Sequence, residues 1–380
     1  MAATIVIVAG EASGDLHGAE LARALRAQAP ECRLIGMGGP AMAAAGVECV
    51  ADVTGQARVG FVEAVGHLGA LRRAFRRLRS IITAPSPPRV VVLIDFPEFN
   101  LRLARVARRG GIPVVYFIPP QIWVWRPGRM KTMRRLVSLV LAVFPFERAL
   151  YQHARVPVEF VGHPLRDRIA DAPSPADARG ALGLDGQDEI IGLLPGSRST
   201  EIGAVLAVMR EAARLVRGVR PRARFVLALA PTVDERAVRS VLGPASEIQV
   251  VRGQTYAVMR AADLLLVTSG TATLEAALLG TPMVVCYRLA ALSELIARAL
   301  VRVPWISLPN LVAGRAVVPE LYRRATTAQG LAQAALALLA NGESLAAQRA
   351  AFAELGEHLG SGGVADRAAA LVLATAAGAR

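Results

Sequence analysis

The chain has 380 residues, too many for one hydrophobic core, so its length predicts two domains of somewhat under two hundred residues each. Its three cysteines are odd in number and far apart, which argues against a disulfide framework and fits a reducing cytoplasm. A hydrophobic fraction of 53% occurs together with a net charge of +14, so the partners are expected to be anionic.

The chain begins with a short apolar run that has no basic segment before it, and we expect a buried first strand there rather than a signal peptide. No uninterrupted apolar stretch reaches the roughly 18 residues of a spanning helix, so no membrane crossing is predicted. In the first half the predicted strands are TIVIVAG, VVVLIDF, PVVYFI, LVLAVFP and VEFVG, separated by helices over 17–29, 100–109 and 146–153. Continuous apolar strands between helices predict a doubly wound, Rossmann-like domain with a parallel sheet over residues 1–170.

A segment rich in Pro, Ala, Gly and Asp, residues 171–186, is predicted to be the linker to a second domain. The strand pattern then repeats in IIGLLPG, RFVLALA, EIQVVRG, DLLLVTSG and PMVVCYR. Residues 187–344 are therefore expected to form a second Rossmann-like domain that faces the first across a cleft. The Ala-rich residues 345–380 are expected to be helical and to pack back on the first domain or on a second subunit.

Polar residues that follow predicted strands are the candidates for chemistry, because ligands of open parallel sheets bind outside the carboxyl ends of the strands. Asp95 follows VVVLI and is a candidate general base, although a solvated loop aspartate fits its position equally well. Glu11 lies in the turn AGEASGD, in which Ser13 or Asp15 could simply cap the next helix. This turn lacks the dinucleotide and P-loop patterns, which disfavours a dehydrogenase or an NTPase.

Two turns in the second half suit a nucleotide diphosphate. LLPGSRS places Ser197 and Arg198 between a strand and a helix, where an arginine can neutralise phosphate charge. TSGTATLEA follows DLLLV and offers hydroxyl groups, free backbone N–H groups and a carboxylate that can accept hydrogen bonds from ribose. Its candidate residues for the UDP-sugar are Ser269, Gly270, Thr271 and Glu275. The plain alternatives are an exposed arginine at a helix end and a helix cap at Thr271.

Nine motifs together resemble the lipid-A-disaccharide synthase family, glycosyltransferase family 19. They are AGEASGDLHG, GMGGPAM, VGFVEA, IDFPEFN, PPQIWVWRPGRMK, VGHPL, LLPGSR, SGTATLEA and SLPNLVAGR. Each motif alone is weak, but their order and spacing extend over nearly the whole chain. In IDFPEFN, Phe96 and Glu98 depart from the family pattern, whereas Asp95 and Asn100 match it.

This resemblance implies a GT-B fold and a role in lipid A biosynthesis. The implied reaction transfers 2,3-diacylglucosamine from UDP to the 6-hydroxyl of 2,3-diacylglucosamine 1-phosphate, with inversion and release of UDP. The resemblance places catalytic residues at Glu11, Asp95, Arg198 and Asn310, and it leaves open whether Asp95 or Glu11 removes the acceptor proton. Neither a metal nor another cofactor is expected, and we find no carboxylate or His pair with metal-ligand spacing after the relevant strands.

Two basic segments are candidates for contact with the acylated acceptor and an anionic membrane surface. In the first, arginines alternate with Leu71, Phe75 and Leu78 in a predicted amphipathic helix, and the second mixes tryptophans with basic residues. The candidates are Arg72, Arg73, Arg76, Arg77, Trp123, Trp125, Arg126 and Arg129. A nucleic-acid patch or a solvated helix face would look similar, but acylated substrates favour lipid, and nucleic acid is not expected as a partner. The expected location is cytoplasmic, peripheral on the inner face of the inner membrane. The sequence leaves open whether the protein forms a homodimer.

Two alternative functions are compatible with the fold class, and each predicts different sequence features. Another GT-B enzyme, such as the N-acetylglucosamine transferase of peptidoglycan synthesis or a UDP-N-acetylglucosamine 2-epimerase, would carry different motifs in its first half. A non-catalytic membrane-surface or nucleic-acid-binding protein would leave Asp95 and Glu11 without a chemical task. The sequence does not determine the preferred acyl-chain length.

Overall fold

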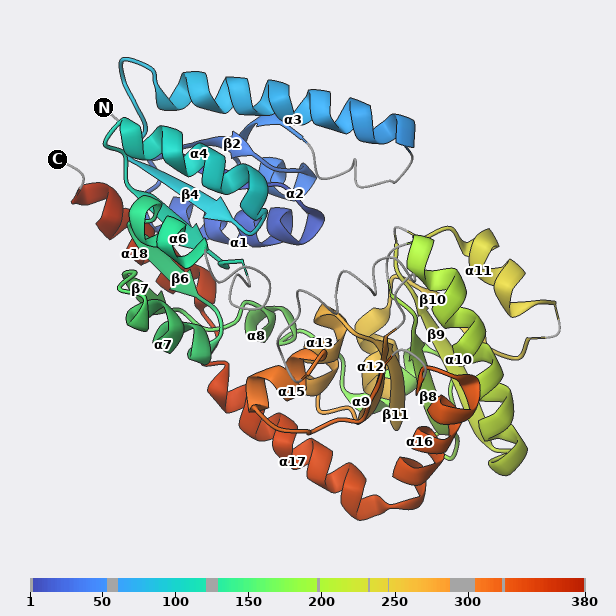
Figure 1. Cartoon of the computed structure of the whole chain (residues 1–380). Helices are drawn as coiled ribbons and strands as arrows, with labels where there is room; N and C mark the ends of the chain where they lie inside the picture. Colours follow the sequence, from blue (N-terminus) through green and yellow to red (C-terminus); the bar gives the residue numbers. More distant parts are fainter. Residues whose placement is uncertain are drawn as a thin grey trace. The chain divides into compact units, whose positions relative to one another are not determined.

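A computed structural model describes residues 3–52, 61–120, 129–196, 199–231, 233–244, 246–287, 305–322 and 325–378. The chain divides into two compact units (Figure 1). Unit 1 comprises Met1–Pro164 and Leu359–Arg380, and unit 2 comprises Leu165–His358. Each unit is built on one parallel sheet, as the continuous apolar strands predict.

The sheet of unit 1 has seven strands in the order β3-β2-β1-β4-β5-β6-β7. Their bounds are β1 Thr4–Ala9, β2 Arg33–Met37, β3 Glu48–Ala51, β4 Val90–Ile94, β5 Val114–Phe117, β6 Leu139–Ala142 and β7 Val158–Phe160. The strand order reverses between β1 and β4, which are paired in parallel. Such a switch point is where ligands of doubly wound sheets bind.

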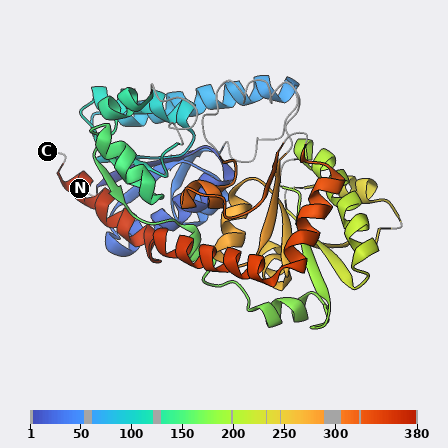
Figure 2. The same cartoon turned by 60° about the horizontal axis from the view of Figure 1, so that its bottom comes forward.

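Helices cover both faces of this sheet (Figures 1 and 2). They are α1 Ala12–Gln28, α2 Pro40–Ala44, α3 Phe61–Ile82, α4 Pro97–Arg109, α6 Met130–Leu136, α7 Pro145–His153 and α18 Val364–Ala377. On one face, apolar side chains of α3, α4, α6 and α7 form a single buried core with those of the strands. On the other face, α1 and α18 lie side by side.

Unit 2 repeats this architecture around six parallel strands in the order β10-β9-β8-β11-β12-β13. The strands are β8 Glu189–Leu194, β9 Ala223–Leu229, β10 Gln249–Arg252, β11 Leu264–Thr268, β12 Met283–Tyr287 and β13 Glu320–Tyr322. Its helices are α8 Leu165–Arg168, α9 Pro175–Ala181, α10 Ser199–Val219, α11 Glu235–Leu242, α12 Thr255–Ala261, α13 Thr271–Leu278, α15 Leu308–Ala313, α16 Ala328–Ala340 and α17 Gly342–His358. Separate apolar cores fill the two faces of the sheet. The switch point lies between β8 and β11.

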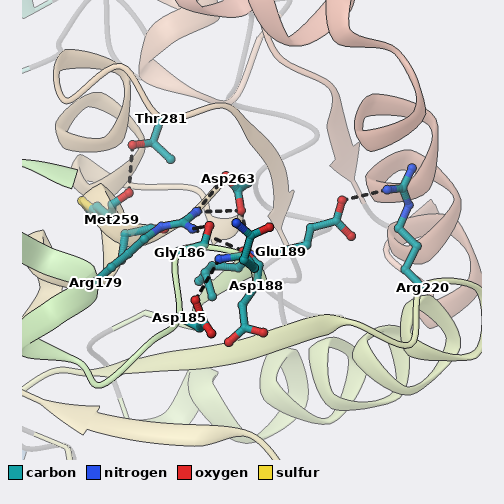
Figure 3. Close-up of polar contacts among 12 residues, drawn as sticks. Arg179, Asp185, Gly186, Asp188, Glu189, Arg220, Met259, Asp263 and Thr281 are labelled. Carbon is teal, nitrogen blue, oxygen red and sulfur yellow. Dashed lines mark hydrogen bonds and ion pairs between the residues drawn. The ribbon is translucent and has the colours of Figure 1, made fainter. Parts of the chain in front are cut away.

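The predicted linker at 171–186 is placed differently in the structure, because this segment belongs to unit 2. Ser174 caps α9 by accepting a hydrogen bond from the amide of Asp177 at 3.2 Å. Arg179 of α9 then donates from Nη2 to both carboxylate oxygens of Asp263 at 3.0 Å, and from Nη1 to the carbonyl oxygen of Gly186 at 3.1 Å (Figure 3). These bonds hold the segment against the start of β11. The chain passes from unit 1 to unit 2 earlier, between Pro164 and Leu165.

The predicted terminal segment at 345–380 also divides between the units. Residues up to His358 complete α17, whose Phe352 is buried in a core of unit 2. From Leu359 onward the chain belongs to unit 1, where α18 packs against α1. The strands β2, β3 and β13 were not predicted from the sequence. β3 and β13 are edge strands, and β2 lies next to β3. These segments are short or contain glycine, so they lack the continuous apolar pattern of the predicted strands.

Candidate active site

In unit 1, the residues after β1 and β4 leave the sheet next to each other. Ala9 and Ile94 are register partners at the ends of these strands, so Glu11 and Asp95 follow at adjacent points of the same edge. Glu11 is exposed and is the N-cap residue of α1, whereas Asp95 is half-buried. The turn requires a glycine at position 10, because a Cβ on Gly10 would lie 2.2 Å from a carbon of the Phe96 ring. The structure therefore brings the two candidate bases together.

Asp95 has the properties of a general base near neutral pH. Burial raises the pKa of Asp95 to about 6, the negative charge of Glu11 adds to the rise, and a backbone hydrogen bond at Phe96 opposes it. Such a carboxyl is ionised at pH 7 and is more basic than an ordinary aspartate. The two neighbouring carboxyl groups thus differ in environment, because Glu11 is exposed and Asp95 is half-buried.

Asp15 has a structural partner that the sequence did not reveal. It lies inside α1, so it does not cap that helix, and it is only 5% exposed. Its carboxylate accepts hydrogen bonds from the backbone amides of Gly39 at 2.7 Å, Ala41 at 3.0 Å and Met42 at 3.0 Å. Asp15 therefore fixes the GMGGPAM segment at the start of α2.

In unit 2, the ends of β8 and β11 meet at the switch point in the same way. Leu194 and Val267 are register partners at the carboxyl ends of these strands. Ser197 and Arg198 follow β8 directly in the sequence, but they lie outside the described residues. The turn after β11 is described and leads into α13.

Residues 269–271 form that turn. Gly270, not Thr271, is the N-cap residue of α13, and no side chain of this cap accepts from the helix amides. The hydroxyl of Thr273 donates to the carbonyl oxygen of Gly270 at 2.7 Å. The hydroxyl of Ser269 donates to the carbonyl oxygen of Ile306, also at 2.7 Å. The turn is thus braced internally, and the start of α13 keeps backbone donors of the kind that bind anions.

Glu275, one turn inside α13, has a partner that sequence reasoning missed. The hydroxyl of Tyr256, on α12, donates to Oε1 of Glu275 at 3.0 Å. Burial raises the pKa of Glu275, while this hydrogen bond and the charge of Arg168 oppose the rise. No motif connects these tyrosine and glutamate positions in the sequence.

Asn310 is fully buried, and both the nitrogen and the oxygen of its side-chain amide form hydrogen bonds within unit 2. Its Nδ2 donates to the carbonyl oxygen of Val318 at 2.9 Å and to Oε1 of Glu320 at 2.8 Å. Its Oδ1 accepts from the amides of Val317 at 2.6 Å and Val318 at 2.9 Å. Glu320 also accepts from the amide and hydroxyl of Ser307, at 2.9 and 2.6 Å. These contacts hold the segments around α15 and β13 together, and a direct catalytic role for Asn310 stays a prediction.

Residues 5–372 match the sequence family described as Lipid-A-disaccharide synthetase. The lipid-A-disaccharide synthase of Geobacter metallireducens is 43% identical over 370 residues, which cover 97% of this chain and 96% of that protein. The enzyme of the same name from Nitrosococcus oceani is 40% identical over 359 residues, covering 94% and 92%. The chain belongs to the lipid-A-disaccharide synthetase family.

Solved structures confirm the fold expected for this synthetase family. A UDP-GlcNAc 2-epimerase from Neisseria meningitidis bound to UDP-GlcNAc has a TM-score of 0.64 at 13% identity, covering 98% of this chain and 100% of that chain. The calicheamicin glycosyltransferase CalG4 has a TM-score of 0.61 at 16% identity, covering 99% of both chains. Both comparisons support the predicted pair of Rossmann-like domains of the GT-B type.

The first basic segment proposed for lipid contact lies on α3 of unit 1. Its candidate arginines are all exposed: Arg72, Arg73, Arg76 and Arg77. Among the apolar side chains between them, Leu78 is buried, whereas Leu71 and Phe75 are partly buried and pack against the core of unit 1. The apolar side chains of this part of α3 thus face mainly into unit 1, and contact of the exposed arginines with an anionic lipid surface stays a prediction.

The second basic segment is described only in part. Trp123, Trp125 and Arg126 lie outside the described residues, and Arg129 forms an ion pair with Glu98 of α4. Among the residues that the structure describes, no helix has the length and apolar character needed to cross a bilayer. Within the same ranges, no group of three or more His, Cys, Asp or Glu side chains is placed to hold a metal ion.

Proposed function

We propose that this member of the synthetase family joins UDP-2,3-diacylglucosamine to 2,3-diacylglucosamine 1-phosphate, giving the lipid A disaccharide 1-phosphate and UDP. The observation that carries the proposal is the family match over residues 5–372. The placement of Asp95 and Glu11 at one switch point and of the 269–275 turn at the other supports it.

In the proposed reaction, the 6-hydroxyl oxygen of the acceptor attacks the anomeric carbon of the donor as the bond from that carbon to UDP breaks. The hydroxyl proton passes to the carboxylate of Asp95, and the electron pair of the broken bond leaves with UDP. Inversion requires the base on the face opposite the leaving group. The raised pKa of Asp95, about 6, suits this step at neutral pH. Glu11 is the alternative base.

Unit 2 supplies the groups for the donor in this proposal. Arg198 and the backbone amides at the start of α13 would neutralise the diphosphate, whose charge increases as the glycosidic bond breaks. Glu275, oriented by Tyr256, would accept hydrogen bonds from the ribose hydroxyls. Asn310 and Glu320 would hold the neighbouring segment in place, and a direct catalytic role for Asn310 stays part of the proposal.

The acceptor and donor carry acyl chains, so we assign the exposed arginines of α3 to an anionic lipid surface. Arg72, Arg73 and Arg76 are exposed on the side of α3 that does not pack into unit 1. Arginines near such a surface contribute about 1 kcal/mol each. The proposed location is the cytoplasmic face of the inner membrane.

Incubation of the purified protein with both acylated substrates, followed by mass analysis, tests the proposed function. The expected products are the disaccharide 1-phosphate and UDP, formed only when donor and acceptor are both present. Controls with donor alone and with UDP-N-acetylglucosamine separate this reaction from hydrolysis and epimerisation. Release of UDP without the acceptor, or an epimerised sugar nucleotide, would contradict the proposal.

A further inference from the structure

The chain takes an unusual conformation directly after β4. Asp95 and Phe96 are consecutive residues with positive φ angles of 43° and 47°. This left-handed region is uncommon for residues other than glycine, and a bulky residue there is strained. Such conformations are unfavourable and persist only where the surroundings impose them. The turn that carries the candidate base is therefore held in place by other residues.

Two buried side chains hold this turn through one atom, the carbonyl oxygen of Asp95. The hydroxyl of Tyr116 donates to it at 2.6 Å, and Nδ2 of Asn100 donates to it at 2.7 Å. Nδ2 of Asn100, which lies inside α4, also donates to the carbonyl oxygen of Ile94 at 3.1 Å. The donors come from β5 and α4, which fixes the peptide plane after Asp95 from two directions.

The hydroxyl of Tyr116 is not needed for packing. Tyr116 is fully buried in the apolar core of unit 1, where it lies in register with Leu93 of β4. A phenol hydroxyl in such a core is costly unless it forms a hydrogen bond, and a phenylalanine would fill the same volume. Tyr151, in the same core, shows the contrast: its buried hydroxyl has no hydrogen-bond partner among the described residues.

We propose that Tyr116 is a positioning residue for glycosyl transfer: its hydroxyl, with the amide of Asn100, holds the Asp95–Phe96 turn in the left-handed conformation that aims the Asp95 carboxylate. The inference rests on the proposed function, in which Asp95 accepts the acceptor proton. Tyr116 acts only through Asp95 and touches no substrate. Because the donor groups lie in unit 2, its loss affects turnover and leaves donor binding intact.

The test compares Tyr116→Phe with the matched control Tyr151→Phe. Each change removes one buried hydroxyl from the same core, but only Tyr116→Phe removes a bond to Asp95. We expect Tyr116→Phe to lower kcat about 10- to 100-fold with the KM for the UDP-sugar within twofold, since small misplacements of reacting groups cost rates of this size. Tyr151→Phe is expected to keep parental kcat. Parental kcat in Tyr116→Phe, or an equal loss in both variants, overturns the positioning role.

Combining Tyr116→Phe with Asp95→Asn separates this inference from the base assignment. If Tyr116 acts through Asp95, Tyr116→Phe causes no further loss of turnover in the Asp95→Asn background. The same fold-loss in both backgrounds indicates an independent effect and overturns the positioning role alone. Parental turnover of Asp95→Asn overturns the base assignment, and the positioning role with it.

Asn100→Leu gives a second route to the same test if Tyr116→Phe fails to fold. It removes the other donor to the Asp95 carbonyl, and it also removes a buried Oδ1 that has no partner in the described part of the chain. The carbonyl oxygen of Ile94 also loses this donor, so the fold of Asn100→Leu is compared with that of the parent by circular dichroism and thermal melting before its kinetics are measured. We expect a fall in kcat with unchanged donor KM, and a parental kcat in folded Asn100→Leu contradicts the inference.

Discussion

Glu11 lies beside Asp95 at the carboxyl edge of the unit 1 sheet, and its charge adds to burial in holding the pKa of Asp95 at about 6. The two carboxyl groups are neighbours because β1 and β4 end at the same register position. The pKa of Asp95, and with it the pH dependence of the reaction rate, therefore depends on Glu11.

The first prediction concerns that pH dependence. The proposed base works only when Asp95 is ionised, so kcat/KM should fall about tenfold per pH unit below about 6 and level off above it. Glu11→Gln removes a negative charge that raises the pKa of Asp95, so the acid limb should move to lower pH. The measurement is the pH profile of kcat/KM for both proteins. An acid limb that stays in place in Glu11→Gln would contradict the coupling.

The second prediction concerns the donor. Glu275→Ala should raise the KM for the UDP-sugar about 10- to 100-fold, because hydrogen bonds to a charged group are worth roughly 1.5–3 kcal/mol. Ribose contacts are similar in the ground and transition states, so kcat should change little. Tyr256→Phe should shift KM in the same direction by a smaller factor, since it removes only the partner of Glu275. A loss confined to kcat in Glu275→Ala argues against a ribose contact.

The third prediction concerns Arg198, which lies outside the described residues. Arg198→Ala should raise the KM for the donor and lower turnover by about 10²-fold, because the leaving diphosphate gains charge in the transition state. Arg198→Lys keeps the charge but not the planar fork of donors, so an intermediate loss is expected. Steady-state kinetics with the UDP-sugar varied provide the measurement. Unchanged donor kinetics in Arg198→Ala would refute the assignment.

The fourth prediction concerns lipid contact through α3. Replacing Arg72, Arg73 and Arg76 together by Glu should lower binding to anionic vesicles about tenfold or more, and activity with it. The candidate arginines of α3 are exposed, so the attraction is expected to be electrostatic. It should weaken at high salt, because the Debye length is roughly 10 Å at 0.1 M and becomes shorter as salt is added.

The matched control for α3 reverses three exposed arginines of the neighbouring α4: Arg102, Arg105 and Arg109. Both triple variants change the net charge by the same amount, so a difference between them assigns the effect to the face of α3. Vesicle sedimentation of the two variants and the parent is the measurement. Equal losses in both variants, or parental binding to neutral vesicles as strong as to anionic ones, would remove α3 from the proposal.

The sequence predicted the two sheets and the strand-end residues because both follow from local patterns. Apolar strands separated by helices indicate parallel sheets, and the turns after them carry Asp95 and Ser269 at their carboxyl ends. The segment 171–186 has the composition of a linker, but it belongs to unit 2. Its Ser174 and Pro175 in fact begin a helix, a cap pattern that was present in the sequence.

Other features depend on contacts that no local pattern contains. The bond from Tyr116 to Asp95 joins residues 21 positions apart, and Asp15 binds the amide of Gly39 across 24 positions. The amphipathic pattern of α3 predicted an apolar face, but not that the core of unit 1 covers it. Partners of this kind become visible only once the sheet order and the helix packing are known.

The most direct measurement is the turnover of Asp95→Asn with both acylated substrates at saturation. The amide keeps the shape of the side chain and removes its basicity, so turnover should fall by about 10² to 10⁴, with the KM for the UDP-sugar unchanged. Near-parental turnover in a normally folded Asp95→Asn protein would contradict the assignment of Asp95 as the base. If Glu11→Gln then loses turnover, the base is Glu11, and Asp95 is at most an orienting group.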